Sequence, residues 1–377
     1  MFKIILALLT LALFTSTANA WWALPHTVVV TVAYNHLTPT SRTKINNLIG
    51  QSTKYLVAPQ KGQGKPSIPP MLEATFFADH IKHEHGLPYN YNNVLHIIHF
   101  INIPIKPLND RTYSEPKQAI DGYLALPEPL AKYNILTSMQ AEIKTLTLSN
   151  STKKEKQMAV EMLLDSVSNL HNPMHVASPI IDNVNTLGAT QVMLTPAVTL
   201  PPSQFSKSES TLGDLHELFD ATAGAIPPVQ RGARLPVAFF SYAQNKALEL
   251  ERVFGKNAEI KKQLTLVDPM QWLQASLALA QEAILPSKVS LEVNLASHTM
   301  VIAKFKNKAN YIAMVQTMTS KQLYLAGYRL AEVLNAIYDP KHANQDMLNY
   351  VSQIKHDNKI PSFQQLTNNY PRLDEQH

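Results

Sequence analysis

The chain begins with a segment that has the parts of a cleavable export signal, and no cysteine occurs anywhere in the sequence. Lys3 precedes an apolar stretch over 4–14, and Ala18-Asn19-Ala20 supplies small residues at a cleavage position. This stretch is too short to span a bilayer, so the sequence predicts removal of residues 1–20 rather than anchoring. An exported chain without cysteine forms no disulfide, so core packing or bound metal must stabilise it.

Composition favours helices for the 357 residues that remain (377 minus 20). Apolar residues make up 45% of the chain, which is enough for a real core, whereas 11 glycines are few for a turn-rich β-sandwich. The 25 prolines would lie in long connections between helices. We therefore predict a mainly α fold, with one helical domain over 21–340 and a polar, poorly packed C-terminal tail over 341–377.

Hydrophobic periodicity places the elements of this domain. The clearest helix covers 153–170, where apolar residues recur near a helical period and Pro173 follows. Further helices are predicted over 28–48, 71–83, 129–148, 211–223, 236–253, 269–283 and 321–338. Residues 290–305 alternate as a strand does, and 179–210 shows no strong period and is predicted to be an irregular excursion.

The new N-terminus is a candidate metal ligand. Cleavage after Ala20 would leave Trp21 with a free α-amino group, five residues ahead of His26. An α-amino group titrates near pH ~8 and can therefore shed its proton and bind a metal at neutral pH. The alternative is that Trp21 and Trp22 are ordinary core residues.

Four further clusters carry metal-ligating side chains. They lie at Asp79-His80-Ile81-Lys82-His83, at His96 and His99, at Asp165, Asn169 and His175, and at His216 and Asp220. Residues four apart share a helix face, and imidazole with carboxylate is a set that zinc accepts. Each cluster also has an ordinary explanation: a solvated histidine patch, a satisfied core histidine, or a hydrogen bond on a helix face.

The order of these clusters resembles the zinc-dependent single-strand nucleases of the S1/P1 type, relatives of the zinc phospholipases C. The resemblance runs from Trp21 to about Tyr338 and includes a closing helix over 325–335. It implies a mainly helical domain with up to three zinc ions. The implied metal ligands are Trp21, His26, Asp79, His99, Asp165, Asn169, His175, His216 and Asp220.

The resemblance also implies how these residues divide. Trp21 and His26 would bind one ion of a close pair, Asp79 and His99 the other, and His175, His216 and Asp220 a more separate third ion. Asp79 and Lys82 would act in catalysis, with Lys82 facing the phosphate. Phe100 would stack on a base and Asn102 would read its edge. His96 is the alternative to His99.

Two departures affect the predicted ion pair. The family carries His and then a bridging Asp where this chain has Asp165 and Asn169. A neutral carboxamide bridges two dications poorly, because it leaves their mutual repulsion uncompensated. The family's Gly-Gly-Asn stretch is replaced by Asn185-Thr-Leu-Gly-Ala-Thr. The third-ion set is complete, whereas the paired set is altered.

The function implied is that of an exported metal-dependent endonuclease, periplasmic or secreted and monomeric. It would cleave single-stranded DNA or RNA to 5′-phosphorylated nucleotides and would have no membrane anchor after signal removal. Two alternatives stay open. One is a phospholipase C-like phosphoester hydrolase, and the other is a catalytically silent paralogue that keeps one structural zinc.

Overall fold

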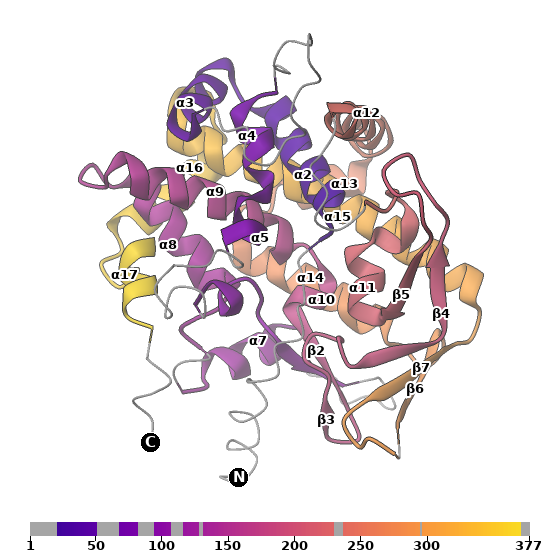
Figure 1. Cartoon of the computed structure of the whole chain (residues 1–377). Helices are drawn as coiled ribbons and strands as arrows, with labels where there is room; N and C mark the ends of the chain where they lie inside the picture. The colour runs from indigo at the N-terminus through magenta and orange to yellow at the C-terminus, as the bar shows by residue number, and fades with distance from the viewer. Residues whose placement is uncertain are drawn as a thin grey trace.

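The computed structural model describes residues 21–50, 68–81, 94–106, 116–127, 131–229, 237–294 and 296–370. The predicted export signal lies outside these residues. Within them the chain is mainly helical, which confirms the predicted fold class, and two small sheets lie at one side of the helical body (Figure 1). No helix in the described ranges is long and apolar enough to cross a membrane.

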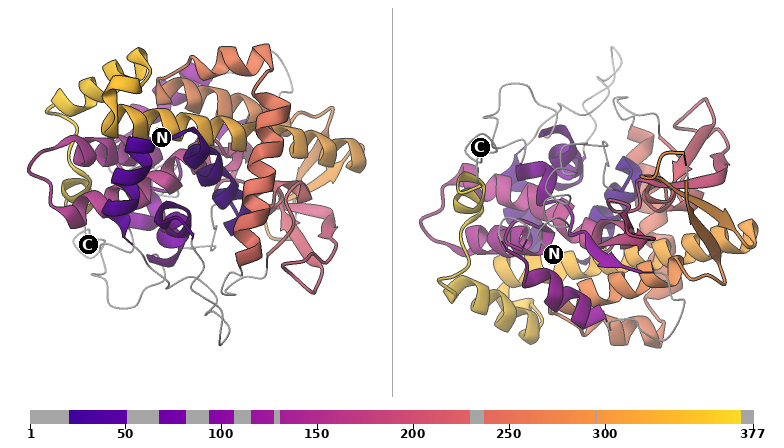
Figure 2. Two further views of the ribbon diagram at one scale, coloured as in Figure 1. Left: turned by 90° about the horizontal axis from the view of Figure 1, so that it is seen from above. Right: turned by 90° about the horizontal axis from the view of Figure 1, so that it is seen from below.

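The helix α15 (Lys308–Tyr338) runs along the helical body and packs against α2 (Ala23–His36), as Figure 2 shows. Gly327 lies where the two helices meet. A Cβ added at Gly327 would come within 2.5 Å of the Val32 Cβ and 2.6 Å of the Val29 carbonyl oxygen. The missing side chain therefore allows the close approach that fixes α2, the helix carrying the first predicted histidine ligand.

Helices α8 (Ile135–Thr147) and α9 (Lys153–Leu170) pack against each other. Each begins with a capping box, formed by Asn134 in α8 and Thr152 in α9, which satisfies N–H groups that would otherwise lack partners. The predicted helix over 153–170 is confirmed residue for residue. Its C-terminal half is buried throughout, so polar side chains there face the interior.

The other helices surround this framework. They are α3 (Pro39–Ile49), α4 (Pro70–Glu73), α5 (Phe77–Ile81), α7 (Pro116–Leu124), α10 (Pro173–Val176), α11 (Leu215–Asp220), α12 (Val237–Phe254), α13 (Ala258–Leu264) and α14 (Pro269–Ala283), with short 3-10 turns η2 (Ala74–Phe76), η3 (Thr222–Gly224) and η4 (Pro340–His342). The predictions over 236–253 and 269–283 are confirmed, whereas α15 begins 13 residues before the predicted 321 (308 against 321).

A small sheet positions two parts of the predicted site. Strand β1 (Ile103–Ile105) runs parallel to β2 (Ala177–Ile181), with Ile103 opposite Ala177, and β3 (Val184–Asn185) pairs antiparallel with β2. The residues just before β1 therefore lie beside those just before β2. The Ile101 N–H donates to the His175 carbonyl at 2.8 Å and continues this pairing toward the site.

The second sheet has the order β5-β4-β7-β6. Its strands are β4 (Val192–Leu200), β5 (Ser210–Asp214), β6 (Val289–Val293) and β7 (Val301–Phe305). The strand-like alternation over 290–305 is confirmed in part, because β6 and β7 are strands and the residues described between them are not. The irregular excursion predicted over 179–210 is wrong, because strands form there through local pairing of β2 with β3 and of β4 with β5, and through pairing with the distant strands β1 and β7. The helix predicted over 211–223 is also corrected: its start is strand β5, and only α11 is α-helical.

The C-terminal region is not poorly packed, contrary to the prediction from its polar composition. Helices α16 (Gln345–His356) and α17 (Phe363–Asn368) bury one apolar face each. Met347 and Ile354 join the main core, and Phe363 joins a second cluster with residues of α9. The Phe363 N–H donates to Thr145 Oγ1 of α8 at 2.8 Å. Few apolar residues suffice here because they recur on one helix face.

Candidate metal centre

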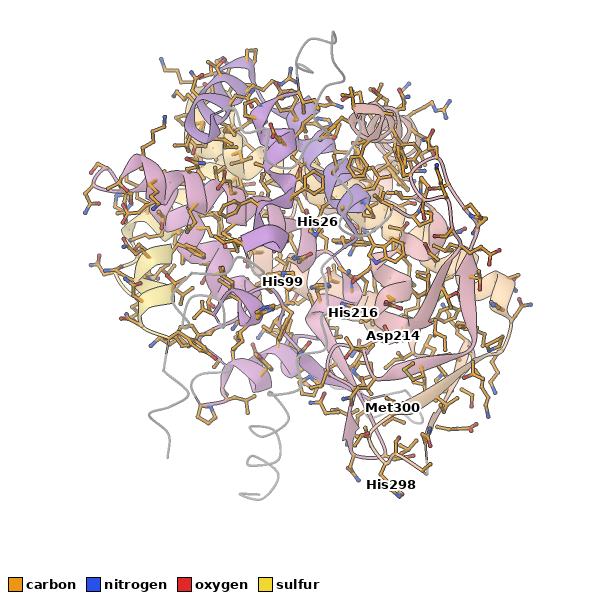
Figure 3. All side chains as sticks on the ribbon, viewed as in Figure 1. His26, His99, Asp214, His216, His298 and Met300 are labelled. Atoms are coloured by element: carbon orange, nitrogen blue, oxygen red, sulfur yellow. The ribbon has the colours of Figure 1, made fainter. Side chains whose placement is uncertain are left out.

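Histidines from distant parts of the chain meet in the interior. Figure 3 shows His26, His99 and His216 near the middle of the molecule, whereas His298 lies far from them on the hairpin between β6 and β7. The three central histidines are at most 4% exposed. Burying an imidazole without a polar or metal partner costs free energy, so the groups around each ring indicate its role.

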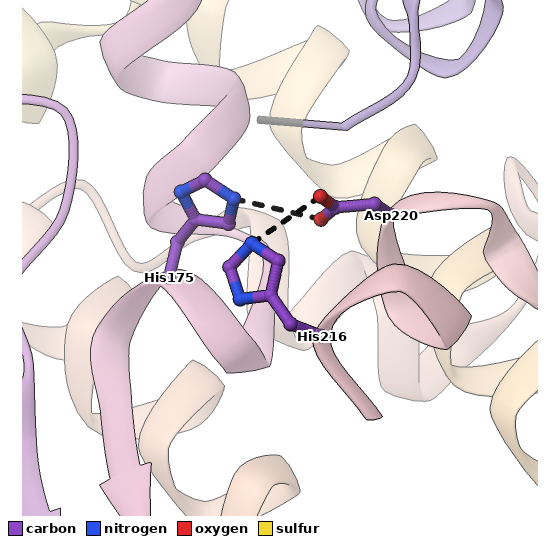
Figure 4. Close-up of side chains that lie close together, drawn as sticks. All are labelled: His175, His216 and Asp220. Atoms are coloured by element: carbon purple, nitrogen blue, oxygen red, sulfur yellow. Dashed lines mark ion pairs between the residues drawn. The ribbon is translucent and has the colours of Figure 1, made fainter. Parts of the chain in front are cut away.

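The tightest group consists of His175 on α10 with His216 and Asp220 on α11. Their ligand atoms all lie within 4.8 Å of one another. In Figure 4 both imidazoles point at the Asp220 carboxylate: His175 Nε2 is 3.5 Å from Oδ1 and His216 Nε2 is 3.2 Å from Oδ2. The four-residue spacing of His216 and Asp220 places them on one helix face, as the sequence predicts.

Backbone carbonyls orient both rings. His216 Nδ1 lies 2.7 Å from the Gly188 carbonyl oxygen, and His175 Nδ1 lies 3.4 Å from that of His99. A carbonyl only accepts, so each Nδ1 carries a proton, and Nε2 is the ring atom that faces Asp220. Neither Nε2 has a hydrogen-bond partner among the described residues. Two imidazole nitrogens and a carboxylate that face one point are a donor set that suits a cation.

Asn172 holds the carboxylate of this group. Its Oδ1 accepts from the Met174 N–H at 3.1 Å, which begins α10, and its Nδ2 donates to Asp220 Oδ1 at 2.7 Å. Because the backbone N–H fixes which amide atom accepts, the other must donate. Such bonds to a ligating carboxylate orient it and tune metal affinity.

Without a cation, the same group titrates as a coupled cluster. Burial lowers the pKa of His216, but the nearby Asp220 carboxylate outweighs it and raises that pKa to about 9. Burial lowers the pKa of His175 below its ordinary range. Burial raises the pKa of Asp220, yet His216 and His175 outweigh this and hold it well below its ordinary value. A metal must therefore displace a proton shared with His216.

A second group lies beside the first. His99 Nδ1 is 3.0 Å from Asp165 Oδ2 and 3.1 Å from Asn169 Nδ2, and His26 Nε2 is 3.7 Å from Asp165 Oδ1. All four residues are at most 3% exposed. The His99 and His175 rings meet edge to face with centroids 5.1 Å apart, so the two groups adjoin.

The first two described residues, Trp21 and Trp22, form hydrogen bonds beside both groups. Trp21 is 1% exposed, and its indole Nε1 donates to the Ser168 carbonyl at 2.9 Å, next to Asn169. The Trp22 N–H donates to the Asp220 carbonyl at 3.1 Å. The start of the described chain thus lies between the C-terminal ends of α9 and α11.

Gly188 lies between His216 and Asn102. A Cβ added there would come within 3.1 Å of Asn102 Oδ1 and 3.6 Å of His216 Nδ1. Gly188 also has φ +67, in the left-handed region that favours glycine. It comes from the stretch that replaces the family's Gly-Gly-Asn, so one glycine of the altered stretch supplies the carbonyl that orients His216.

The sequence model of one protein family, described as S1/P1 Nuclease, matches residues 21–339. The chain belongs to the S1/P1 nuclease family. Among curated proteins no match is found. Membership supports a hydrolase that acts on phosphodiester bonds, with nucleic acid as its class of substrate. A metal requirement agrees with the buried His-His-Asp group.

For this S1/P1 nuclease, the structure places most of the predicted site residues in the two adjoining groups. His99, rather than His96, contacts Asp165 and Asn169. Phe100 and Asn102 follow it, each half-buried. The Asp79 side chain and Lys82 lie outside the described residues, so their predicted roles stay predictions.

The sequence did not predict the hydrogen bonds that His171 forms at the C-terminal end of α9. His171 Nδ1–H donates to the Val167 carbonyl at 2.7 Å, and buried Arg329 of α15 donates to His171 Nε2 at 2.8 Å. Burial and then the Arg329 charge keep the pKa of His171 well below its ordinary value, so the ring stays neutral. The Arg329 guanidinium also lies 5.1 Å from the Trp272 ring centroid. A histidine four residues before His175 was the available signal.

Proposed function

We propose that this S1/P1 nuclease is an exported, zinc-dependent phosphodiesterase that cleaves single-stranded DNA or RNA to 5′-phosphorylated products. The observation that carries the proposal is the buried group of His175, His216 and Asp220. The Nε2 atoms of its two imidazoles converge on one carboxylate, and neither Nε2 has a hydrogen-bond partner among the described residues.

Zinc suits this donor set better than the hard cations do. Mg²⁺ and Ca²⁺ take oxygen ligands, whereas two imidazole nitrogens and one carboxylate form a common catalytic zinc set that leaves a fourth position open. When bound, zinc lowers the pKa of water and neutralises charge on phosphate oxygens. No disulfide is available to the chain, so a bound ion would also stabilise the fold.

Residues of the chain would orient the metal-binding side chains and the bases of the substrate. The carbonyls of Gly188 and His99 fix the histidine tautomers, and Asn172 fixes the carboxylate. Asn102 lies beside Gly188 and offers an amide that can hydrogen-bond to a base edge. Phe100, half-buried at the same turn, would stack on a base. Stacking needs an unpaired base, which favours single strands.

The test is cleavage by metal-free and zinc-reconstituted protein of single-stranded DNA, single-stranded RNA and a matched duplex. We expect cleavage of single strands that chelation abolishes and zinc restores. His216→Ala should reduce cleavage by about 100-fold or more, since it removes a ligand. The matched control is His298→Ala, which changes a histidine far from the centre and should leave the rate within about twofold.

The alternatives appear as distinct outcomes. Hydrolysis of phosphatidylcholine without cleavage of nucleic acid would favour the phospholipase C-like enzyme. A protein that keeps about one zinc per chain and cleaves neither substrate would be the silent paralogue. Asp165→His with Asn169→Asp places His and Asp where the family carries them. If zinc content climbs in this variant while activity neither appears nor rises, the proposed ligand positions are misassigned.

A further inference from the structure

The C-terminal segment over 340–370 follows the part of the chain that matches the family model, which ends at residue 339. The segment is firmly attached: Lys144 Nζ of α8 donates to the Lys355 carbonyl at 2.7 Å and to the Asp357 carbonyl at 3.0 Å. Figure 1 shows α17 beside α8 at the edge of the helical body. The family match assigns no role to this segment, so its contacts with the rest of the chain are the evidence for one.

The end of the segment shares an apolar cluster with the residues that lead to His99. Three cluster members come from the C-terminal segment and three directly precede His99: Phe363, Leu366 and Tyr370 on one side, and Val94, Leu95 and Ile98 on the other. All six are at most 6% exposed. Close packing at this depth holds the backbone in one position. Phe100 and Asn102 follow His99, so the packing fixes the start of the turn that carries the predicted base-binding side chains.

A second connection runs through Tyr133. Its hydroxyl donates to the Asn369 carbonyl at 2.5 Å, and its ring meets that of Tyr370 edge to face, with centroids 4.9 Å apart. Two residues later, the Ile135 N–H donates to the Phe100 carbonyl at 3.1 Å. Three consecutive residues therefore join the C-terminal segment to the backbone of Phe100.

Asn134 orders the backbone between Tyr133 and Ile135. Its Oδ1 accepts from the Leu136 and Thr137 N–H groups at 3.0 and 3.2 Å, and its own N–H donates to Thr137 Oγ1 at 3.1 Å. This capping box begins α8 and fixes the backbone on both sides of Asn134. A shift of the Tyr133 ring would therefore move the N–H group that holds the Phe100 carbonyl.

Two backbone hydrogen bonds thus hold the turn from opposite sides. The Ile101 N–H donates to the His175 carbonyl beside the metal centre, and the Phe100 carbonyl accepts from Ile135 beside the C-terminal segment. A binding residue that is ordered before its ligand arrives spares the entropy of ordering it during binding. The second bond therefore bears on how tightly Phe100 can hold a base.

We propose that the C-terminal segment is a positioning element for the substrate, which acts through Tyr133 to hold the turn of Phe100 and Asn102 in the orientation that binds a single strand. Tyr133 and Tyr370 are positioning residues in this account. The proposal deepens the proposed function and rests on it for the identity of the substrate. A loosened turn lowers the fraction of molecules that are competent to bind, and the apparent affinity falls by the same fraction.

The first test compares two full-length variants that each lose one hydroxyl from a buried tyrosine. Tyr133→Phe loses the bond to Asn369, and the matched control Tyr311→Phe loses a bond to the Ala283 carbonyl at 2.9 Å. Amide hydrogen exchange is measured at Ile101 and Ile135. Both amides should exchange about fivefold faster in Tyr133→Phe, the factor that corresponds to a hydrogen bond of about 1 kcal/mol. They should be unchanged in Tyr311→Phe, because local opening of the turn does not involve that bond.

Cleavage kinetics on single-stranded DNA then separate binding from chemistry. KM should rise about fivefold in Tyr133→Phe, while kcat and the zinc content stay within about twofold of the wild type. Tyr370→Leu keeps an apolar side chain and loses the ring contact, and it should show the same effects with unchanged circular dichroism. An unchanged KM, or equal exchange in Tyr133→Phe and Tyr311→Phe, would overturn the proposal. Faster exchange at both amides in a protein that cleaves no nucleic acid would support the positioning of the turn and refute only the nuclease activity.

Discussion

Gly327→Ala tests the helix contact that positions α2 and His26, a predicted metal ligand. The added Cβ would lie 2.5 Å from the Val32 Cβ and 2.6 Å from the Val29 carbonyl oxygen. Both partners are stiff, so the helices must separate. Overpacking costs about 1–3 kcal/mol, and the better helix propensity of alanine returns about 1 kcal/mol. We expect a net loss of up to about 2 kcal/mol in the free energy of unfolding.

Urea unfolding at constant zinc measures this difference. The matched control is Gly122→Ala in α7, where an added Cβ meets nothing within 4 Å. This control should gain about 0.5–1 kcal/mol from propensity alone. If both variants gain the same amount, the close approach of α2 and α15 is not as described. Gly327→Ala should also weaken zinc binding at the centre containing His26, because that residue moves with α2.

Three further outcomes are expected. Asn172→Ala removes the bond to Asp220 and should weaken zinc binding by about 10–100-fold in competition with a chelator; unchanged affinity would show that the bond does not tune the metal. Burial raises the pKa of Glu142 from 4.5 to about 8, so the folded protein keeps a proton that the unfolded chain loses. Stability to urea should therefore fall as the pH rises from about 4.5 to about 8, and Glu142→Gln should lessen the fall; equal falls would exclude this carboxyl. Trp21→Phe loses the bond to Ser168 and should cost about 1 kcal/mol in urea unfolding, whereas no loss would place the indole N–H in water.

The helices were predictable where one apolar face recurs over several turns, as in α9 and α14, because periodicity reports which side meets the core. The strands between 177 and 214 were not. Pro196 and Pro201 and many polar residues obscure alternation there, and β4 is held by pairing with β7, more than a hundred residues later. Pairing at such sequence distance leaves no local signal.

Part of the candidate site was also predictable from local spacing, and the rest depends on how the helices pack. The four-residue spacing of His216 and Asp220 predicted one face of a helix, and α11 has it. Spacing could not show that Asp165 lies between His26 and His99, because that depends on how α2 and α9 pack. Nor could it show that the carbonyl of Gly188 orients His216. Contacts through backbone atoms are set by the fold and carry no residue signature.

The most direct test of the account is cleavage of single-stranded DNA and RNA by the purified protein as zinc is removed and restored. The account predicts cleavage to 5′-phosphorylated products that disappears with chelation, returns with zinc, and is lost in His216→Ala. A protein that carries its full complement of zinc and leaves both single strands intact would contradict it.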